Sequence, residues 1–107
     1  MAHQMFVIGI DLGKNWFHVV GMDRDGKVVL RKRLNRAQLG EFAASIVTCR
    51  VAMESCPGSQ YWGRRFAAAG HELRIIPAQF VKPYVKSNKN DYNDAEAIAE
   101  AGIAKPE

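Results

Sequence analysis

The stretch from Phe6 to Gly13, which reads Phe-Val-Ile-Gly-Ile-Asp-Leu-Gly, places a single carboxylate, Asp11, at the end of an apolar run. Four of the five residues before Asp11 are apolar, which is typical of a core strand covered on both faces. An ionised carboxylate near a core is costly unless it is hydrogen-bonded, paired with a cation or bound to a metal. We therefore expect Asp11 near the centre of the fold, with a group nearby that compensates its charge.

The composition indicates one globular domain. The chain has 107 residues, of which 48% are hydrophobic and 24% charged, and this excludes a disordered or fibrous protein. Lys and Arg outnumber Asp and Glu by 15 to 11, and the net charge of +4 mildly favours a polyanionic partner.

The two cysteines, Cys49 and Cys56, have no second pair and no His at zinc-ligand spacing, so neither a disulfide framework nor a structural zinc site is indicated. A reducing compartment fits best. No apolar run approaches the roughly 20 residues that span a bilayer, and Met1 to Met5 is too short and polar for a signal peptide. We expect a cytoplasmic protein with no membrane partner.

Three antiparallel strands are predicted to open the chain. The stretch around Asp11 forms the first, Trp16 to Met22 the second and Lys27 to Leu34 the third. The turn between the last two is Asp23-Arg24-Asp25-Gly26, in which Gly26 accepts a positive φ.

Helices and strands then alternate. Asn35 can cap a helix from Arg36 to about Val47, and Gly70 can end a second helix from Ser59 to Ala69. The expected inner positions are Leu39, Phe42, Ala43 and Ile46 in the first helix and Tyr61, Trp62, Phe66 and Ala69 in the second.

Two further strands are predicted at Arg50 to Glu54 and Leu73 to Ile76. The fold class is therefore α/β, a mixed five-stranded sheet with three antiparallel strands first and then parallel strands with helices on both faces. Ligands of such sheets gather at the carboxyl ends of the strands. Asp11 and Glu54 both lie at that end of their strands.

The last part of the chain is less regular. Ala78 to Asn90 could hold a short helix interrupted by Pro83, with Phe80, Val81, Tyr84 and Val85 on one face, followed by a loop from Ser87 to Asn90. A final helix is predicted from Asp91 to Gly102. Asp91 and Asp94 are three apart, which would put both side chains on one face of that helix.

Four carboxylates from three elements, Asp11, Glu54, Asp91 and Asp94, form a candidate site. If they converge, their mutual repulsion requires cations. Mg²⁺, with Mn²⁺ as a substitute, prefers such oxygen ligands. Two ions about 4 Å apart can activate a nucleophile and stabilise the leaving oxygen in phosphoryl transfer.

Each acid also has a simpler interpretation. Asp91 could cap the last helix and Asp94 could complement its dipole. Glu54, which precedes a Cys-Pro-Gly turn, could be exposed to solvent. Asp11 is the hardest to explain in this way, because a solvated turn Asp rarely follows so apolar a strand.

Other side chains carry weaker signals. His18 is interpreted as a partly exposed strand residue rather than a ligand, and Cys56 as a small packed residue rather than a nucleophile. Four lysines near the expected strand ends could hold phosphates and bind nucleic acid, or could simply be solvated. They are Lys14, Lys82, Lys86 and Lys89.

Several short motifs together resemble the N-terminal DEDD domain of the IS110 family of insertion-sequence transposases. They are Gly9-Ile10-Asp11-Leu12-Gly13-Lys14, Ala52-Met53-Glu54-Ser55 with Gly58 and Tyr61-Trp62, Pro77, and Asn90-Asp91-Tyr92-Asn93-Asp94-Ala95. The resemblance covers nearly the whole chain, and it is the order and spacing of the motifs that make it specific.

The resemblance implies a RuvC-like, ribonuclease-H-like fold in which Asp11, Glu54, Asp91 and Asp94 bind Mg²⁺ for DNA strand cleavage and joining. It also implies a structured guide RNA and a homo-oligomer as partners. Family proteins carry a second, C-terminal domain with a Ser that acts with the acids. We expect residues 1–107 to be only the DEDD domain, incomplete without that second domain. Cys56-Pro57 also departs from the Thr-Gly-type turn expected after the Glu.

Three other functions remain open at this stage. The chain could be a free-standing RuvC-like junction nuclease, or a module that binds nucleic acid or oligomerises without activity of its own. An actin-like ATPase fragment begins with a similar Asp-Leu-Gly, but the chain is too short for two lobes and has Lys14-Asn15 where hydroxyls for phosphate are usual.

Overall fold

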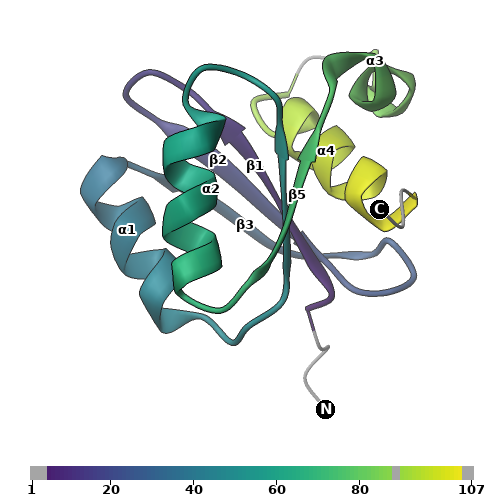
Figure 1. Cartoon of the computed structure of the whole chain (residues 1–107). Helices are drawn as coiled ribbons and strands as arrows, with labels where there is room; N and C mark the ends of the chain where they lie inside the picture. The colour runs from purple at the N-terminus through teal and green to yellow at the C-terminus, as the bar shows by residue number, and fades with distance from the viewer. Residues whose placement is uncertain (1–4, 88–89, 105–107) are drawn as a thin grey trace.

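A computed structural model describes residues 5–87 and 90–104 and shows one five-stranded mixed sheet (Figure 1). The strands lie in the order β3-β2-β1-β4-β5, so β1, which carries Asp11, is central. Their bounds are β1 Val7–Leu12, β2 Phe17–Met22, β3 Val28–Leu34, β4 Arg50–Glu54 and β5 Glu72–Ile76.

The strand directions confirm the expected mixture. β1 and β2 are antiparallel, as are β2 and β3, whereas β1 with β4 and β4 with β5 are parallel. Parallel neighbours need long crossovers. The helix α2 (Ser59–Ala68) forms the crossover between the parallel neighbours β4 and β5, and α1 (Arg36–Ser45) lies in the connection from β3 to β4. This order and these directions give the sheet its ribonuclease-H-like arrangement.

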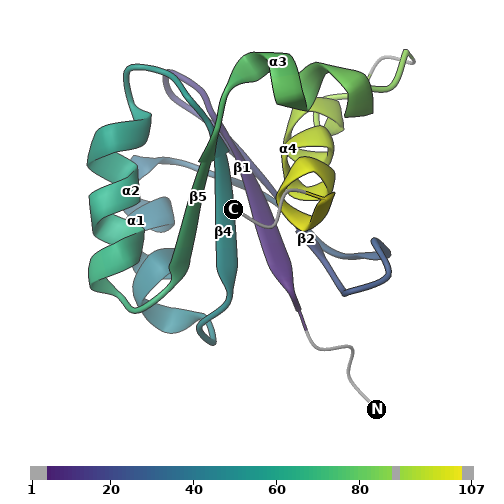
Figure 2. The ribbon, with the colours of Figure 1, turned by 45° about the vertical axis from the view of Figure 1, so that its right-hand side comes forward.

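Helices cover both faces of the sheet, as predicted. Figure 2 shows α1 and α2 on one face and α4 (Asn93–Ala104) on the other. Side chains of each strand alternate between two cores, because successive residues point to opposite faces. Ile8 and Ile10 of β1 pack on the α1 and α2 side, and Val7 packs on the α4 side with Ile98.

Local signals explain the ends of several elements. The side chain of Asn35 accepts a hydrogen bond from the Gln38 amide at 2.8 Å, and the Gln38 side chain accepts one from the Asn35 amide at 2.9 Å. This capping box begins α1. Gly26 and Gly70 have φ values of +83° and +97°, which other residues rarely adopt. Both glycines therefore act as the sequence predicts.

The helix predictions need three corrections. α1 ends at Ser45, so Ile46 lies just beyond it. In α2, Trp62 and Phe66 are buried as expected, but Ala69 follows the helix. Tyr61 is 44% exposed, and its hydroxyl accepts a hydrogen bond from Arg65 Nη1 at 2.8 Å, a partner available only on the outer surface.

The segment after β5 is short and broken, as Pro83 predicts. A four-residue helix α3 (Ala78–Val81) passes into a 3₁₀ turn η1 (Lys82–Tyr84) that contains Pro83. Val81 is buried, but Phe80 and Val85 keep about two-fifths of their surface exposed, so the expected inner face is only partly realised. Asn88 and Lys89, part of the predicted loop, lie outside the described residues.

The last helix begins later than predicted. α4 starts at Asn93 rather than Asp91 and continues to Ala104. The side chain of Asn90 accepts a hydrogen bond from the Tyr92 amide at 2.7 Å, which bends the chain in an Asx-type turn before the helix starts. Asp91 is therefore a turn residue.

Small residues allow α4 to lie directly on the central strands. A methyl group at Gly9 would lie 2.3 Å from the Ala95 carbonyl oxygen and 2.4 Å from the Ala99 amide nitrogen. One at Gly102 would lie 2.9 Å from Cβ of Ala52. Because of these contacts, α4 runs antiparallel to β1, and the first turn of α4 lies at the carboxyl end of that strand.

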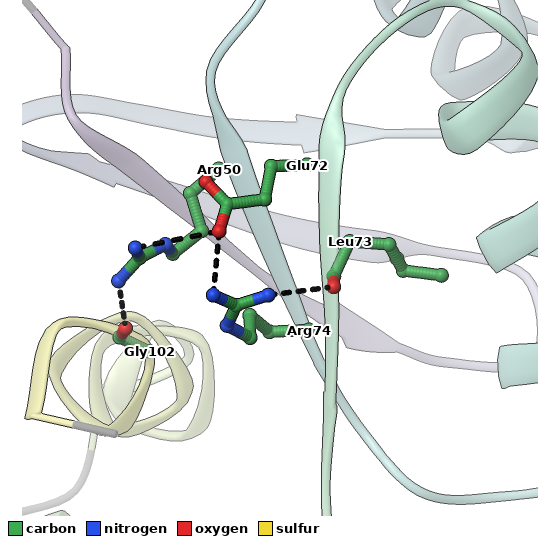
Figure 3. A network of polar contacts seen from close by, with 5 residues as sticks. All are labelled: Arg50, Glu72, Leu73, Arg74 and Gly102. Atoms are coloured by element: carbon green, nitrogen blue, oxygen red, sulfur yellow. Dashed lines mark hydrogen bonds and ion pairs between the residues drawn. The ribbon is translucent and has the colours of Figure 1, made fainter. Parts of the chain in front are cut away.

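Arg50, one member of a polar network, holds the other end of α4 (Figure 3). Arg50 Nη1 donates a hydrogen bond to the Gly102 carbonyl at 2.9 Å, which places a cation at the negative end of the helix dipole. Arg50 and Arg74 share one oxygen of Glu72, with N to O distances of 3.4 and 2.5 Å. This network ties the end of α4 to β4 and β5.

Candidate functional site

The strand register puts Asp11 and Glu54 side by side. Ile10 pairs with Met53 in the last pair of the parallel β1 and β4 ladder, and Asp11 and Glu54 are the next residues. Asp11 lies two residues after Gly9 and Glu54 two after Ala52, so both carboxylates point to the face that α4 covers. The expected pairing of the two strand ends is confirmed.

Asp94 joins them from the first turn of α4. The close packing of Ala95 on Gly9 brings this turn to the end of β1. The pKa of Asp11 is raised above its ordinary value, first because the half-buried side chain loses solvent and then because Asp94 and Glu54 are negatively charged. Asp94 and Glu54 thus both act on Asp11 at the carboxyl edge of the sheet.

Asp91 stands apart from these three. It lies exposed in the turn before α4, so the prediction that it shares a helical face with Asp94 is wrong. The N-cap interpretation is also wrong for Asp91, because Tyr92 immediately precedes the helix and Asn90 supplies the hydrogen-bonding side chain. Its role as a metal ligand stays a prediction.

The donor set fits a hard cation without forming a closed cage. Within residues 5–87 and 90–104, no three His, Cys, Asp or Glu side chains are arranged so that they could hold a metal ion as they stand. The same part of the chain gives the Asp11 carboxylate no ion pair that would offset its neighbours. Binding of Mg²⁺ stays a prediction, and it would not need a closed cage, because this ion keeps several waters and uses only one or two carboxylates with substrate phosphates.

His18 belongs to the site, although none of the residues next to it in the sequence marks it as a site residue. It is the antiparallel partner of Asp11, and its positive form lowers the pKa of that carboxyl group. Its ring packs edge-on against Tyr92, with centroids 5.2 Å apart. His18 is partly exposed in β2, as predicted. Counting the pairs from the Gly13 to Trp16 turn would have revealed its partner.

The turn after Glu54 closes on itself despite its unusual Cys56-Pro57. Ser59 is buried, its Oγ donates a hydrogen bond to the Cys56 carbonyl at 2.7 Å, and its amide donates to the same oxygen at 3.0 Å. The Ser55 amide also donates to the Ile76 carbonyl at 2.8 Å. Glu54 is therefore held between β1 and β5 by a well-bonded backbone.

Neither cysteine has the surroundings of a nucleophile. Both are free and half-buried. Burial raises the pKa of the Cys49 thiol to about 11, so it is protonated at neutral pH. The interpretation of Cys56 as a packed residue agrees with its place in the Ser59 turn.

The four lysines are arranged unequally around the acids. Lys14 is exposed in the turn after β1, beside the carboxyl end that carries Asp11, and Lys82 is exposed in η1. Lys86 pairs with Glu100 of α4 at 3.5 Å, which offsets part of its charge. Lys89 lies outside the described residues.

Within residues 5–87 and 90–104, no helix is long and apolar enough to cross a bilayer.

Comparison with known proteins identifies the family. Residues 8–107 match the DEDD transposase family of IS110. The chain is 53% identical over 95 residues to the transposase for insertion sequence element IS1328 of Yersinia enterocolitica. It is 51% identical over 94 residues to a probable family 20 transposase of Pseudomonas aeruginosa. It is 47% identical over 95 residues to the transposase for insertion sequence element IS1111A of Coxiella burnetii.

These alignments take in 88–89% of this chain but only 26–28% of each relative. The chain therefore spans about a quarter of the length of the curated relatives that it matches. The aligned family region includes all four predicted acids and His18. The chain belongs to the DEDD transposase family of IS110.

Proposed function

We propose that this domain supplies the acidic metal site with which a transposase cuts and joins DNA strands. The observation that supports the proposal most directly is the raised pKa of Asp11 beside Glu54 and Asp94. A divalent cation among these oxygens would offset the repulsion and favour the ionised form of Asp11.

The chain's own residues position the site. Adjacent rigid strands carry Asp11 and Glu54, and α4, which rests on Gly9, carries Asp94. These three would hold Mg²⁺ or Mn²⁺, and Asp91 would join them from its turn. When bound, the ion would activate the attacking oxygen and stabilise the leaving oxygen during phosphoryl transfer.

The family adds proposals for the longer protein. Resemblance to IS110 recombinases supports DNA as the substrate, a structured guide RNA as a second partner, a homo-oligomeric assembly and a C-terminal domain that contributes a Ser. A transposase function agrees with the printed names of the relatives.

Calorimetric titration with Mn²⁺ tests the metal site. We expect saturable binding to the wild-type domain and a loss of at least about tenfold in affinity for Asp11→Asn and Glu54→Gln, as typical of lost charged ligands. Glu96→Gln is the matched control, because Glu96 is also an acid of the first turn of α4 but is absent from the groups that shift the pKa of Asp11.

The Mn²⁺ affinities of Asp94→Asn and Asp91→Asn then show whether three or four carboxylates bind the ion. A loss of affinity in Asp94→Asn alone indicates three ligands, and a loss in both variants indicates four. Equal affinity of the wild-type domain and Asp11→Asn would contradict the proposal. Such a result would favour a module that binds nucleic acid without metal chemistry of its own.

A further inference from the structure

Positive charge is concentrated in one segment of the chain. Residues 26–40, which contain β3, carry five Lys or Arg and no Asp or Glu, so this segment alone exceeds the net charge of +4 of the whole chain. The five are Lys27, Arg31, Lys32, Arg33 and Arg36. The rest of the molecule is close to neutral.

The sheet turns two of these arginines toward the face that carries the acids. Arg33 pairs with His18 and Arg31 pairs with Val20, and residues paired across antiparallel strands point to the same side. Val20 lies in the core beneath α4, so this is the α4 side. Both arginines are exposed at the edge of the sheet, since α4 packs on β1, β2 and β4.

An exposed aromatic ring lies beside them. Trp16, just before β2, keeps 45% of its surface exposed. The guanidinium of Arg33 lies 4.5 Å from the centroid of its ring, within the range of a cation–π contact. Cationic groups beside an exposed aromatic ring are the combination that proteins use for unpaired nucleic acid, in which charge follows the backbone and the ring stacks a base.

Edge charges alone have a simpler explanation. Charged side chains on an edge strand prevent it from pairing with another sheet. That purpose does not require the exposed Trp16, nor the complete absence of acids over fifteen residues. The combination therefore favours a binding surface over a purely protective edge.

We propose that Arg31, Arg33 and Trp16 form a docking strip for single-stranded DNA that leads a strand to Asp11. The inference rests on the proposed function, which makes Asp11 part of the cutting site. Arg33, His18 and Asp11 lie in one row across neighbouring strands, so the α-carbons of Arg33 and Asp11 are about 10 Å apart. A strand on the strip would reach the acids within a few nucleotides.

Fluorescence anisotropy with a labelled oligothymidine, measured in EDTA, tests the strip apart from the metal. We expect Trp16→Ala to weaken binding about tenfold, since one stacked base is lost, and Trp16→Phe to restore most of the affinity. The pair Arg31→Gln and Arg33→Gln should lower the slope of log affinity against log salt by about 1.4, as two phosphate contacts on a single strand predict. Arg64→Gln, which removes one exposed arginine charge from α2, is the control for each single arginine replacement.

A second variant tests whether the strand reaches the acids. Without metal, the acid cluster repels phosphate, so Asp11→Asn should tighten oligothymidine binding to the wild-type strip. The gain should disappear when Arg31 and Arg33 are both replaced, because the strand is then no longer directed there.

Three results would overturn the inference: binding unchanged by the Trp16 and Arg replacements, equal weakening by Arg64→Gln, or a preference of at least about tenfold for oligouridine or duplex DNA. No effect of Asp11→Asn would overturn the path to the acids. Because these measurements exclude metal, they can fail while Mn²⁺ titration succeeds, and the reverse, so the two proposals are tested separately.

Discussion

Asp11 is a carboxylate that folding makes harder to ionise. Its raised pKa means that the folded domain holds the proton more tightly than the unfolded chain. Stability of the metal-free domain should therefore fall as the pH rises through the interval between the ordinary pKa of 3.8 and the raised value. The unfavourable contribution is fully present once the pH lies above the raised pKa.

Replacing this carboxylate should stabilise the metal-free domain. We expect Asp11→Asn to have a higher melting temperature than the wild type at pH 7, and the difference to shrink toward zero below pH 3.8, where both side chains are neutral. Thermal unfolding in EDTA across this pH range measures it. Glu41→Gln, an exposed acid of α1, is the control. A lower melting temperature for Asp11→Asn at pH 7 would show that Asp11 is compensated within the fold.

Site residues whose signal is local can be predicted from the sequence. An acid after an apolar strand identifies Asp11, and the same pattern identifies Glu54. His18 could not be ranked in this way, because its importance comes from the strand pairing that places it opposite Asp11. The prediction that Asp91 lies in the helix is wrong for a different reason. The side chain of Asn90 accepts a hydrogen bond from the Tyr92 amide and forms a turn before the helix, which residue spacing alone does not reveal.

At the scale of elements, α4 determines whether the acids meet. It contributes Asp94, and its height above the sheet depends on Gly9, where the backbones of helix and strand touch. The sequence predicts the helix from its apolar pattern, but it gives no distance between helix and strand. Such close approach depends on the absence of a side chain.

A single methyl group should disturb this contact. Gly9→Ala would place Cβ less than 2.5 Å from two backbone atoms of α4, and we expect a loss of about 1–3 kcal/mol in the free energy of unfolding, as for other overpacked sites. Metal affinity should also fall as Asp94 moves away. Urea unfolding and Mn²⁺ titration measure the two effects.

Gly58→Ala is the matched control for this replacement. A methyl group at Gly58 would meet only Cδ1 of Leu12 at 3.8 Å, and its φ of −82° suits alanine. We expect this variant to be as stable as the wild type or slightly more stable. Equal behaviour of the two glycine variants would contradict the role given to Gly9.

At the scale of the whole molecule, one sheet separates two cores. Phe66 and Trp62 belong to the core under α1 and α2, and Ile98 belongs to the core under α4. β1, β2 and β4 contribute side chains to both cores, so the same strands link the two cores. The continuous apolar run before Asp11 allowed this arrangement to be predicted, because a strand that is covered on both faces requires helices on both sides of the sheet.

The shared strands predict one cooperative unfolding transition. In a Trp16→Phe background, the fluorescence of buried Trp62 reports on one core, and amide exchange at Ile98 reports on the other. We expect both to give the same free energy of unfolding. A lower value at Ile98 would show that α4 opens independently of the sheet.

The arginine network at the far end of α4 gives the site a remote point of adjustment. Gly102, which Arg50 binds, lies about 12 Å along the helix from Asp94. A helix of this length behaves as a stiff rod, so a small tilt imposed where Arg50 binds it would shift the opposite end. A structural change around Arg50 would therefore alter the distance between Asp94 and the two strand carboxylates.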